Sequence, residues 1–400
     1  CWGVNETLHS IRILCWNESN WDELDVQIYN LEKTDDTTIT QCNIVFLIPR
    51  YATGEESYYV FYDDSSKEYP DYIDHVQLLD KYYYYEPITG ISVEGDYYEI
   101  REDDYIIYGV GQKGKVLNRH LSQIAIRMKP GTKKFDMLKT DLLTSFCFSY
   151  LTGPEDEDEV ASDAELLAKE ILVDGNLMVR FRLVSQSQNK KLFTSNVYTY
   201  YYQPGDDKRI SVTVHHEIKD DLRIKEEKNG DGRFGTIISY HSKSPNLKKM
   251  EFGEILPYVY VSTDDGIREY SLEQDPENSD REWIISYNDN CNIGQDSWLA
   301  YGNGNTGKTH GLIFSSNKVI TNGSNERDGI EIKVTEKEYL DVISAEVDYA
   351  SIGFGRNAFE PDETHDLTID KGLEVTFDVE FYTTNDGGYE RIEHESQFFR

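Results

Sequence analysis

The chain has 400 residues, of which 74 are acidic and 40 are basic, so its formal net charge at pH 7 is −34. A field of this sign repels nucleic acid and anionic membrane surfaces, and it favours solubility and divalent cations such as Ca²⁺. No apolar run approaches the ~18 residues of a membrane-spanning helix, so we expect no membrane span. The length allows one large β-domain or two ordinary ones.

The first part of the chain, residues 1–65, is interpreted as a small N-terminal β-domain. Polar and apolar residues alternate over 25–30, as in a half-buried strand. Trp2, Trp16 and Trp21 gather in the same stretch. They predict either a small core or a platform on which sugar rings stack.

Residues 63–71 are rich in Asp and Ser and indicate a linker, after which a large β-sandwich domain is expected over residues 76–400. Within this domain, residues 161–172 are the one helical candidate. Ser162 is a suitable N-cap and Glu165 follows at the spacing of a capping box.

The clearest pattern is NVYTYYYQPGDDKRISVTVHHEI, residues 196–218. Two strand-like runs flank the turn residues 203–207, and the second run alternates apolar and polar side chains with a period of two. Residues 373–381 alternate in the same way, with one apolar and one acidic face. The sequence therefore predicts an all-β fold, a large two-sheet antiparallel β-sandwich preceded by a small β-domain.

Residues 302–309, GNGNTGKT, match the spacing of a phosphate-binding loop. That loop requires a strand before it and a helix after it, whose N-terminal amides hold the phosphates. Residues 310–314 here read as a second strand. The pattern favours a long hairpin loop over a nucleotide site.

A second motif, residues 227–232, resembles the first half of a calcium loop, but Ile238 stands where the bidentate Glu is needed. Either a β-turn or a partial Ca²⁺ site through Asn229 and Asp231 fits this pattern. Ca²⁺ is the one cofactor that we consider.

The histidines give no clear catalytic set. His215 and His216 are adjacent on a predicted strand, so they point to opposite faces, and His216 is expected in the core. Arg119 and His120, with His216, are the alternative catalytic group, since Arg and His could neutralise a uronate and move a proton. Neither a Gly-x-Ser-x-Gly nor a His-Glu-x-x-His motif occurs. The chain is therefore expected to lack catalysis, with the enzyme alternative open.

Three of the five cysteines lie in the first 42 residues, and a Cys15–Cys42 disulfide or buried thiols are both consistent with this. The chain begins at Cys1 without an initiator Met, which indicates a removed leader or an excerpt of a longer polypeptide, and an N-terminal Cys could carry a lipid anchor. Glycosylation sequons begin at Asn5, Asn17 and Asn322.

Residues 197–218, the 298–316 hairpin and the closing strand HDLTIDKGLEVTFDVEF resemble the two-sheet supersandwich of galactose mutarotase-like domains. The resemblance covers roughly residues 76–390 and provides no functional residue. It implies a fold whose members bind or process carbohydrate, with non-catalytic versions in secreted prokaryotic surface proteins. The N-terminal unit, ending YYVFYDD, is similar to β-modules of such surface proteins.

Together these observations predict an extracellular structural or adhesive protein of the cell surface, a subunit of a surface layer, sheath or filament stabilised by cations. Its partners would be copies of itself or cell-surface glycans, without nucleic acid. The alternative is a carbohydrate-binding or polysaccharide-processing, lyase-like β-sandwich.

Overall fold

The computed structural model describes residues 1–17, 19–49, 57–89, 91–103, 105–116, 124–128, 141–145, 150–152, 159–161, 163–187, 189–224, 234–242, 258–274, 283–285, 289–323, 325–328, 330–334, 338–340, 345–354 and 367–399. This part of the chain is almost entirely β-structure. It contains no helix that is both long and apolar enough to cross a membrane.

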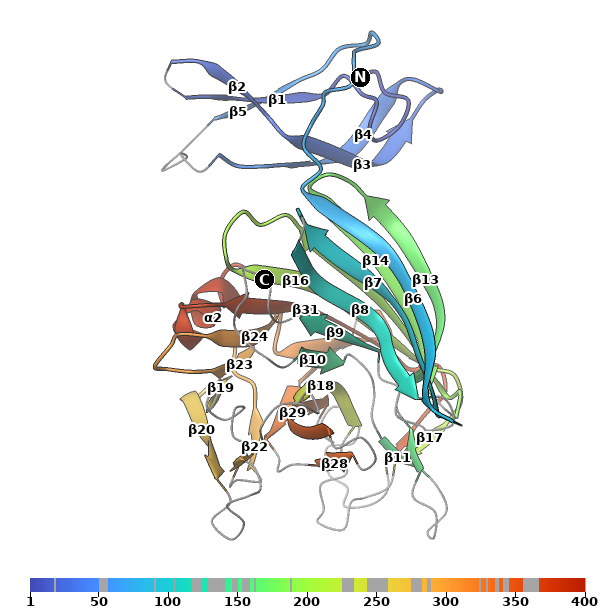
Figure 1. Ribbon diagram of the computed structural model, residues 1–400, viewed down its shortest axis with the longest axis vertical. Coiled ribbons are helices and arrows are strands. Elements are labelled where there is room, and N and C mark those ends of the chain that lie inside the picture. Colours follow the sequence, from blue (N-terminus) through green and yellow to red (C-terminus); the bar gives the residue numbers. More distant parts are fainter. Residues whose placement is uncertain are drawn as a thin grey trace.

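The N-terminal strands form small sheets of their own at one end of the molecule (Figure 1). Strands β1 (Arg12–Trp16), β2 (Trp21–Leu24) and β5 (Tyr58–Phe61) pair in the order β2-β1-β5, and β3 (Val26–Lys33) pairs with β4 (Ile39–Phe46). Two small apolar clusters lie beneath them, one around Ile13 and the other around Ile28.

The larger sheet of the main body has 12 strands. Its main path runs β13 (Asp163–Asp174), β14 (Met178–Ser187), β15 (Leu192–Tyr201), β16 (Lys208–Ile218), β31 (Glu374–Thr384), β24 (Thr309–Phe314), β23 (Trp298–Gly302), β19 (Tyr258–Thr263), β20 (Gly266–Gln274) and β21 (Trp283–Ile285). Off this path, β25 (Lys318–Thr321) pairs with β31 and with β26 (Asn325–Asp328).

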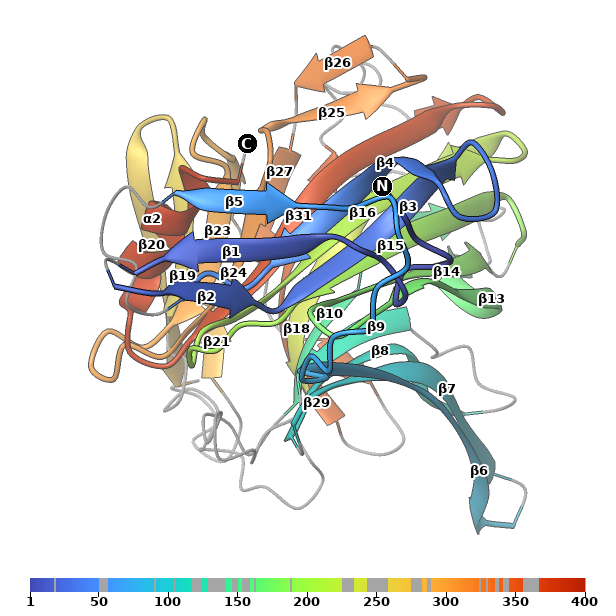
Figure 2. The ribbon, with the colours of Figure 1, turned by 90° about the horizontal axis from the view of Figure 1, so that it is seen from above.

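The second sheet has 10 strands. Its path runs β22 (Asp289–Asn292), β27 (Ile330–Val334), β29 (Ala345–Phe354), β18 (Phe234–Ser242), β10 (Asp141–Ser145), β9 (Ile124–Met128), β8 (Tyr105–Val116), β7 (Ile91–Glu102) and β6 (Val76–Ile88), with β28 (Glu338–Leu340) on β29. Two short pairs join β11 (Tyr150–Thr152) to β12 (Glu159–Ala161) and β17 (Leu222–Ile224) to β30 (Leu367–Ile369). Viewed from above, β6 and β7 reach outward from the body (Figure 2).

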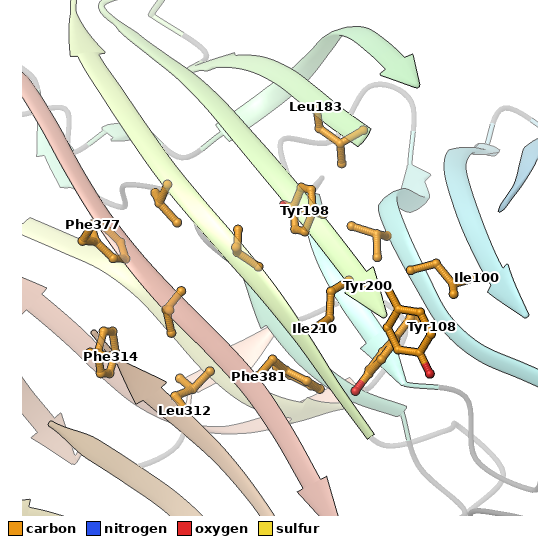
Figure 3. Close-up of a cluster of buried hydrophobic side chains, with 14 of the residues drawn as sticks. Ile100, Tyr108, Leu183, Tyr198, Tyr200, Ile210, Leu312, Phe314, Phe377 and Phe381 are labelled. Atoms are coloured by element: carbon orange, nitrogen blue, oxygen red, sulfur yellow. The ribbon is translucent and has the colours of Figure 1, made fainter. Parts of the chain in front are cut away.

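A single apolar core fills the space between the two large sheets. Ile100 and Tyr108 come from the 10-stranded sheet, whereas Tyr198, Ile210 and Phe381 come from the 12-stranded one (Figure 3). In β16 every second residue is buried, because successive side chains of a strand point to opposite faces. The predicted all-β fold, with a two-sheet antiparallel sandwich, is confirmed.

The helix predicted over residues 161–172 is wrong. Most of that stretch belongs to β13, which pairs with β14 along nearly its whole length and is interrupted by three register shifts. The helix that the structure does describe is α2 (Gly388–Ser396), which follows β31 directly. Its Ile392 packs onto Gly311, where an added Cβ would lie 2.8 Å from Ile392 Cγ2.

A buried ion pair joins the two large sheets. Lys208 on β16 donates from Nζ to Glu102 Oε2 on β7 at 2.6 Å, and both side chains are fully buried. Glu102 Oε1 also accepts from the Tyr200 hydroxyl at 2.6 Å and from the Gln203 amide at 3.0 Å. Lys208 donates further to the carbonyls of Gln203 and Gly205. The charged groups are thus surrounded by hydrogen-bonding partners, as burial requires.

Gln27 is one of the residues that join the N-terminal sheets to the main body. Its side-chain amide donates to Met178 O at 3.0 Å, and its carbonyl accepts from the Leu177 and Met178 amides at 2.9 and 2.7 Å. Nearby, His75 bonds Asp25 at 2.9 Å and stacks on Tyr202 at a centroid distance of 4.2 Å. These contacts fix the N-terminal unit on the β13–β14 turn.

Candidate functional site

The outer side of the sheet β2-β1-β5 carries a group of exposed aromatic rings, which we call the aromatic face: Trp16, Trp21 and Tyr59. Trp16 is 42% exposed and Trp21 is 50% exposed. Their ring centroids lie 5.2 Å apart, and Tyr59 lies 5.1 Å from Trp21. Register explains the grouping, because Trp16 lies directly opposite Trp21 on the paired strands.

The exposure of Trp16 and Trp21 bears on the two interpretations of the tryptophans, whereas Trp2 is half-buried, and a platform for sugar rings stays a prediction. Trp16 and Trp21 are not a small core, since the buried residues below them are Ile13, Cys15 and Leu24. At the other end of the same sheet, Arg12 and Glu23 form an ion pair at 3.4 Å. The face therefore offers a broad apolar contact next to charged groups, as aromatic binding platforms do.

A second candidate is a cavity of about 350 Å³ beside the start of α2, which we call the polar pocket. The loop between β23 and β24 forms one wall and the segment 386–390 forms another, with Tyr260 of β19 between them. Two tight approaches hold the walls together: Gly388 N donates to Gly307 O at 2.8 Å, and Gly307 (φ +72°) lies against the backbone of Asp386. Only a glycine tolerates that position without strain.

Tyr260 is the most unusual side chain of the polar pocket. It is only 4% exposed, and its hydroxyl lies near Gly304 on the pocket wall. No described residue forms a hydrogen bond with this hydroxyl. Burial, followed by the negative charge of Glu269, raises the pKa of Tyr260 to about 12, so the phenol stays protonated and can donate.

The other polar groups of the pocket are both donors and acceptors. Asp386 and Glu390 are its charged lining residues, and their carboxylates accept hydrogen bonds. The N-cap Gly387 provides no side-chain bond; the Gly388 amide is taken by Gly307 O, which leaves the amides of Tyr389 and Glu390 in the first turn of α2 as donors. Tyr389 adds a ring, 4.4 Å from Tyr260. A small neutral ligand with several hydroxyl groups could satisfy these groups together.

The loop 302–309 is a hairpin loop, as predicted, and not a phosphate-binding loop. Gly302 pairs with Thr309, and β24 continues as an antiparallel strand where a helix would be required. Inside the loop, Asn303 Oδ1 accepts from the amides of Asn305 and Thr306 at 3.0 and 3.3 Å. The loop amides thus bind their own asparagine.

The predicted catalytic group is not assembled in the described chain. Arg119 and His120 lie outside the described residues. His216 is a core histidine, as expected: it is fully buried and its Nδ1 lies 2.9 Å from Thr194 Oγ1. Burial, and then the neighbouring His215, hold the pKa of His216 well below its usual value. Such a ring stays neutral and is shielded from solvent.

The candidate calcium ligands Asn229 and Asp231 also lie outside the described residues. Within the part that is described, no three His, Cys, Asp or Glu side chains gather as a metal site. Cys42 is a free thiol in the structure, so the Cys15–Cys42 bridge is not formed there, and the two residues pack with different apolar clusters.

The three sequon asparagines all bond to nearby groups. Asn5 Oδ1 accepts from the Leu8 amide at 2.7 Å, and Asn17 Nδ2 donates to Asp22 at 2.6 Å. Asn322 Oδ1 accepts from the Glu374 amide at 3.0 Å. Asn5 and Asn322 are exposed, whereas Asn17 is half-buried. Glycosylation at these positions stays a prediction.

Sequence reasoning missed the polar pocket. Its two walls lie about 80 positions apart in the chain, and no local pattern indicates that they meet. The signals present were the Gly- and Asn-rich loop 302–309 and the pair Gly387-Gly388. Both indicate turns, not a site.

No protein-family model matches the chain, and no curated protein matches it significantly. Solved structures similar to it include the galactosidase domain of an α-galactosidase–sucrose kinase (10% identity, TM-score 0.37, 79% of this chain and 40% of that chain). Another is a putative aldose 1-epimerase from Klebsiella pneumoniae (9% identity, TM-score 0.38, 81% of this chain and 91% of that chain). A third is a GalM/aldose epimerase homologue from C. elegans (10% identity, TM-score 0.32, 77% of this chain and 100% of that chain). The chain spans about 40% of the galactosidase. A likeness this distant says nothing about activity.

Proposed function

We propose that this protein is an extracellular structural or adhesive component of a cell surface, and that the aromatic face makes the adhesive contact. The observation that supports the proposal most directly is the exposure of Trp16, Trp21 and Tyr59 on one sheet face. A soluble chain with a well-filled core has no need to leave adjacent tryptophans in water, and exposed aromatic groups mark interaction sites.

The charge of the chain fits a role that depends on cations. At a net charge of −34, copies of the protein repel one another unless counter-ions intervene. On the outer side of the 12-stranded sheet, Glu374, Asp378 and Glu217 belong to one face of β16 and β31. In this proposal, Ca²⁺ bridges such acidic faces between neighbouring copies.

Electron microscopy of the purified protein, with Ca²⁺ and with EDTA, tests the proposal. We expect lattices or fibres in Ca²⁺, and their loss in EDTA and in the double variant Trp16→Ala/Trp21→Ala. Tyr62→Ala, which removes an exposed ring from outside the aromatic face, is the matched control and should assemble normally. Isolated monomers under all conditions would refute the structural role, and unchanged assembly in EDTA would refute the calcium part alone.

The second candidate function, carbohydrate binding, is favoured by the polar pocket. The Tyr260 hydroxyl, the carboxylates of Asp386 and Glu390 and the ring of Tyr389 are the groups with which proteins bind sugars. A glycan array and a uronate-lyase absorbance assay test binding and turnover separately. Tyr260→Phe removes only the hydroxyl and should weaken any binding in the pocket severalfold. Silence in both assays would exclude this function.

A further inference from the structure

The buried pair of Lys208 and Glu102 holds an amine nitrogen against a carboxyl group inside the sandwich. Lys208 Nζ lies 2.6 Å from Glu102 Oε2, and neither side chain has any exposed surface. Lys208 belongs to β16 of the 12-stranded sheet and Glu102 to β7 of the 10-stranded one, so the pair spans both sheets. An amine and a carboxyl group are the two reactants of amide formation, and holding two reactants in contact accelerates their reaction strongly.

The other contacts of Lys208 orient its nitrogen toward the carboxyl group. Besides Glu102, Nζ donates to Gln203 O and, at 2.9 Å, to Gly205 O. These three acceptors match the three hydrogens of an ammonium group in number. When the hydrogen shared with Glu102 passes to Oε2, the neutral amine keeps its bonds to the two carbonyls and turns its lone pair toward the carboxyl group. Burial favours this transfer, because a low dielectric disfavours charged groups.

The second carboxyl oxygen, Glu102 Oε1, is held by two donors. The Tyr200 hydroxyl lies 2.6 Å away and the Gln203 amide nitrogen 3.0 Å away. When a nitrogen attacks a carboxyl carbon, negative charge moves onto the oxygen, and donors that are already in place stabilise that charge. Burial, followed by the negative charge of Glu102, raises the pKa of Tyr200 well above its usual value, so the phenol stays protonated as a donor.

We propose that Lys208 and Glu102 condense to an amide bond, which links the two large sheets covalently. In the balanced step, Nζ forms a bond to Glu102 Cδ and the bond from Cδ to Oε2 breaks. Oε2 leaves as water with two hydrogens from the ammonium group, so the step is redox-neutral and consumes no co-reactant. The ion pair is the starting state of this reaction. Freshly folded protein therefore contains the ion pair, and stored protein accumulates the link.

A second lysine of the chain provides an internal control. Lys169 Nζ lies 2.5 Å from Asp96 and also contacts Asp80. The side chains of these aspartates are 36% and 61% exposed, whereas Glu102 is fully buried. Water keeps such carboxylates charged and hydrolyses reactive intermediates, which a water-excluded site prevents. We therefore expect no link at Lys169, although its nitrogen lies as close to a carboxylate as that of Lys208.

Intact mass spectrometry of the full chain tests the proposal without any substitution. We expect folded protein stored at neutral pH to lose the mass of one water molecule with time, and its proteolytic digests to contain two peptides joined through Glu102 and Lys208. Lys208→Arg keeps the positive charge but has no nucleophilic amine, so it should keep its full mass. Tyr200→Phe removes one donor to Oε1 and should form the link about 10²-fold more slowly. Circular dichroism checks that both variants are folded.

Three results would overturn the proposal. The first is an unmodified chain that keeps its full mass after prolonged storage. The second is a loss of water that maps to an Asp-Gly sequence such as Asp174-Gly175, where cyclisation of the aspartate releases the same mass. The third is an equal yield of links at Lys169, which would show that contact with a carboxylate is sufficient. An unchanged rate in Tyr200→Phe would contradict the role of the two donors.

Discussion

Replacing Lys208 by Met tests the view that a buried ion pair fastens the two large sheets. The change keeps the length of the side chain and removes the ammonium group that bonds Glu102 at 2.6 Å. Glu102 would keep its bonds from Tyr200 and Gln203 but would lose its counter-charge in a fully buried site. Breaking one partner of such a pair costs about 3–5 kcal/mol, because the remaining charge is left without compensation.

The expected loss can be converted into a melting temperature. With an unfolding entropy of about 2.1 cal/mol/K per residue, a chain of this length loses about 5 °C for 4 kcal/mol when it unfolds cooperatively. Urea unfolding followed by tyrosine fluorescence gives the free energy directly. The matched control is Lys219→Met, which removes a partly exposed pair with Glu217 and should cost less than about 1 kcal/mol.

A double-mutant cycle with Glu102→Gln separates the pair from its surroundings. If the two charges depend on each other, the double variant should be more stable than the sum of the single losses predicts, by at least about 1.5 kcal/mol. A loss below about 1 kcal/mol for Lys208→Met, or strict additivity in the cycle, would refute the reasoning.

Three further predictions concern stability. Burial lowers the pKa of His310 to about 3 from its usual 6.5, so between these pH values the unfolded chain binds more protons than the folded one. The free energy of unfolding should therefore fall as the pH drops through this window. Acid titrations followed by circular dichroism should show a shallower fall for His310→Gln. Ile392→Ala opens a cavity above Gly311 and should lower the free energy of unfolding by about 2–5 kcal/mol. Hydrogen exchange should then show that the amides of α2 lose their protection early. An exchange pattern like that of the unmodified chain would contradict the packing. Gln27→Ala leaves the Leu177 and Met178 amides of the β13–β14 turn without their side-chain acceptor, whereas Met178 O keeps its bond from the Gly175 amide. The change should cost about 3 kcal/mol and make the N-terminal unit more sensitive to limited proteolysis than the sandwich; equal sensitivity would argue against the junction.

The sequence predicted the sandwich well where one sheet face is buried and the other is wet. The alternation of apolar and polar residues over 210–218 agrees with the burial pattern of β16, because every second side chain of the strand faces the core. The helix prediction for residues 161–172 failed because it rested on the local helix preference of Ala, Glu, Leu and Lys. The pairing of this stretch with β14 overrides that preference. The short helix α2 was not predicted because its N-cap and its first residue are glycines, Gly387 and Gly388, and it has no side-chain cap.

The candidate sites were less predictable than the fold. The tryptophans of the aromatic face were noticed, but their exposure depends on which side of a three-stranded sheet lies over the small core. The polar pocket requires that the loop 303–307 meet the start of α2, a contact made by tertiary packing through Ile392 and Gly311. No sequence pattern in either segment indicates that it contacts the other segment.

The way Gln27 joins the N-terminal unit to the sandwich has a mechanical consequence. If the aromatic face is anchored and the sandwich is held elsewhere, tension passes through the bonds at this junction, those of Gln27 and the one between His75 and Asp25. Such a small group of bonds breaks at much lower force than the long ladder of β14, β15 and β16. We therefore expect the unit to detach first and to extend the segment 63–75 as a tether, sparing the sandwich from unfolding when the surface is under strain.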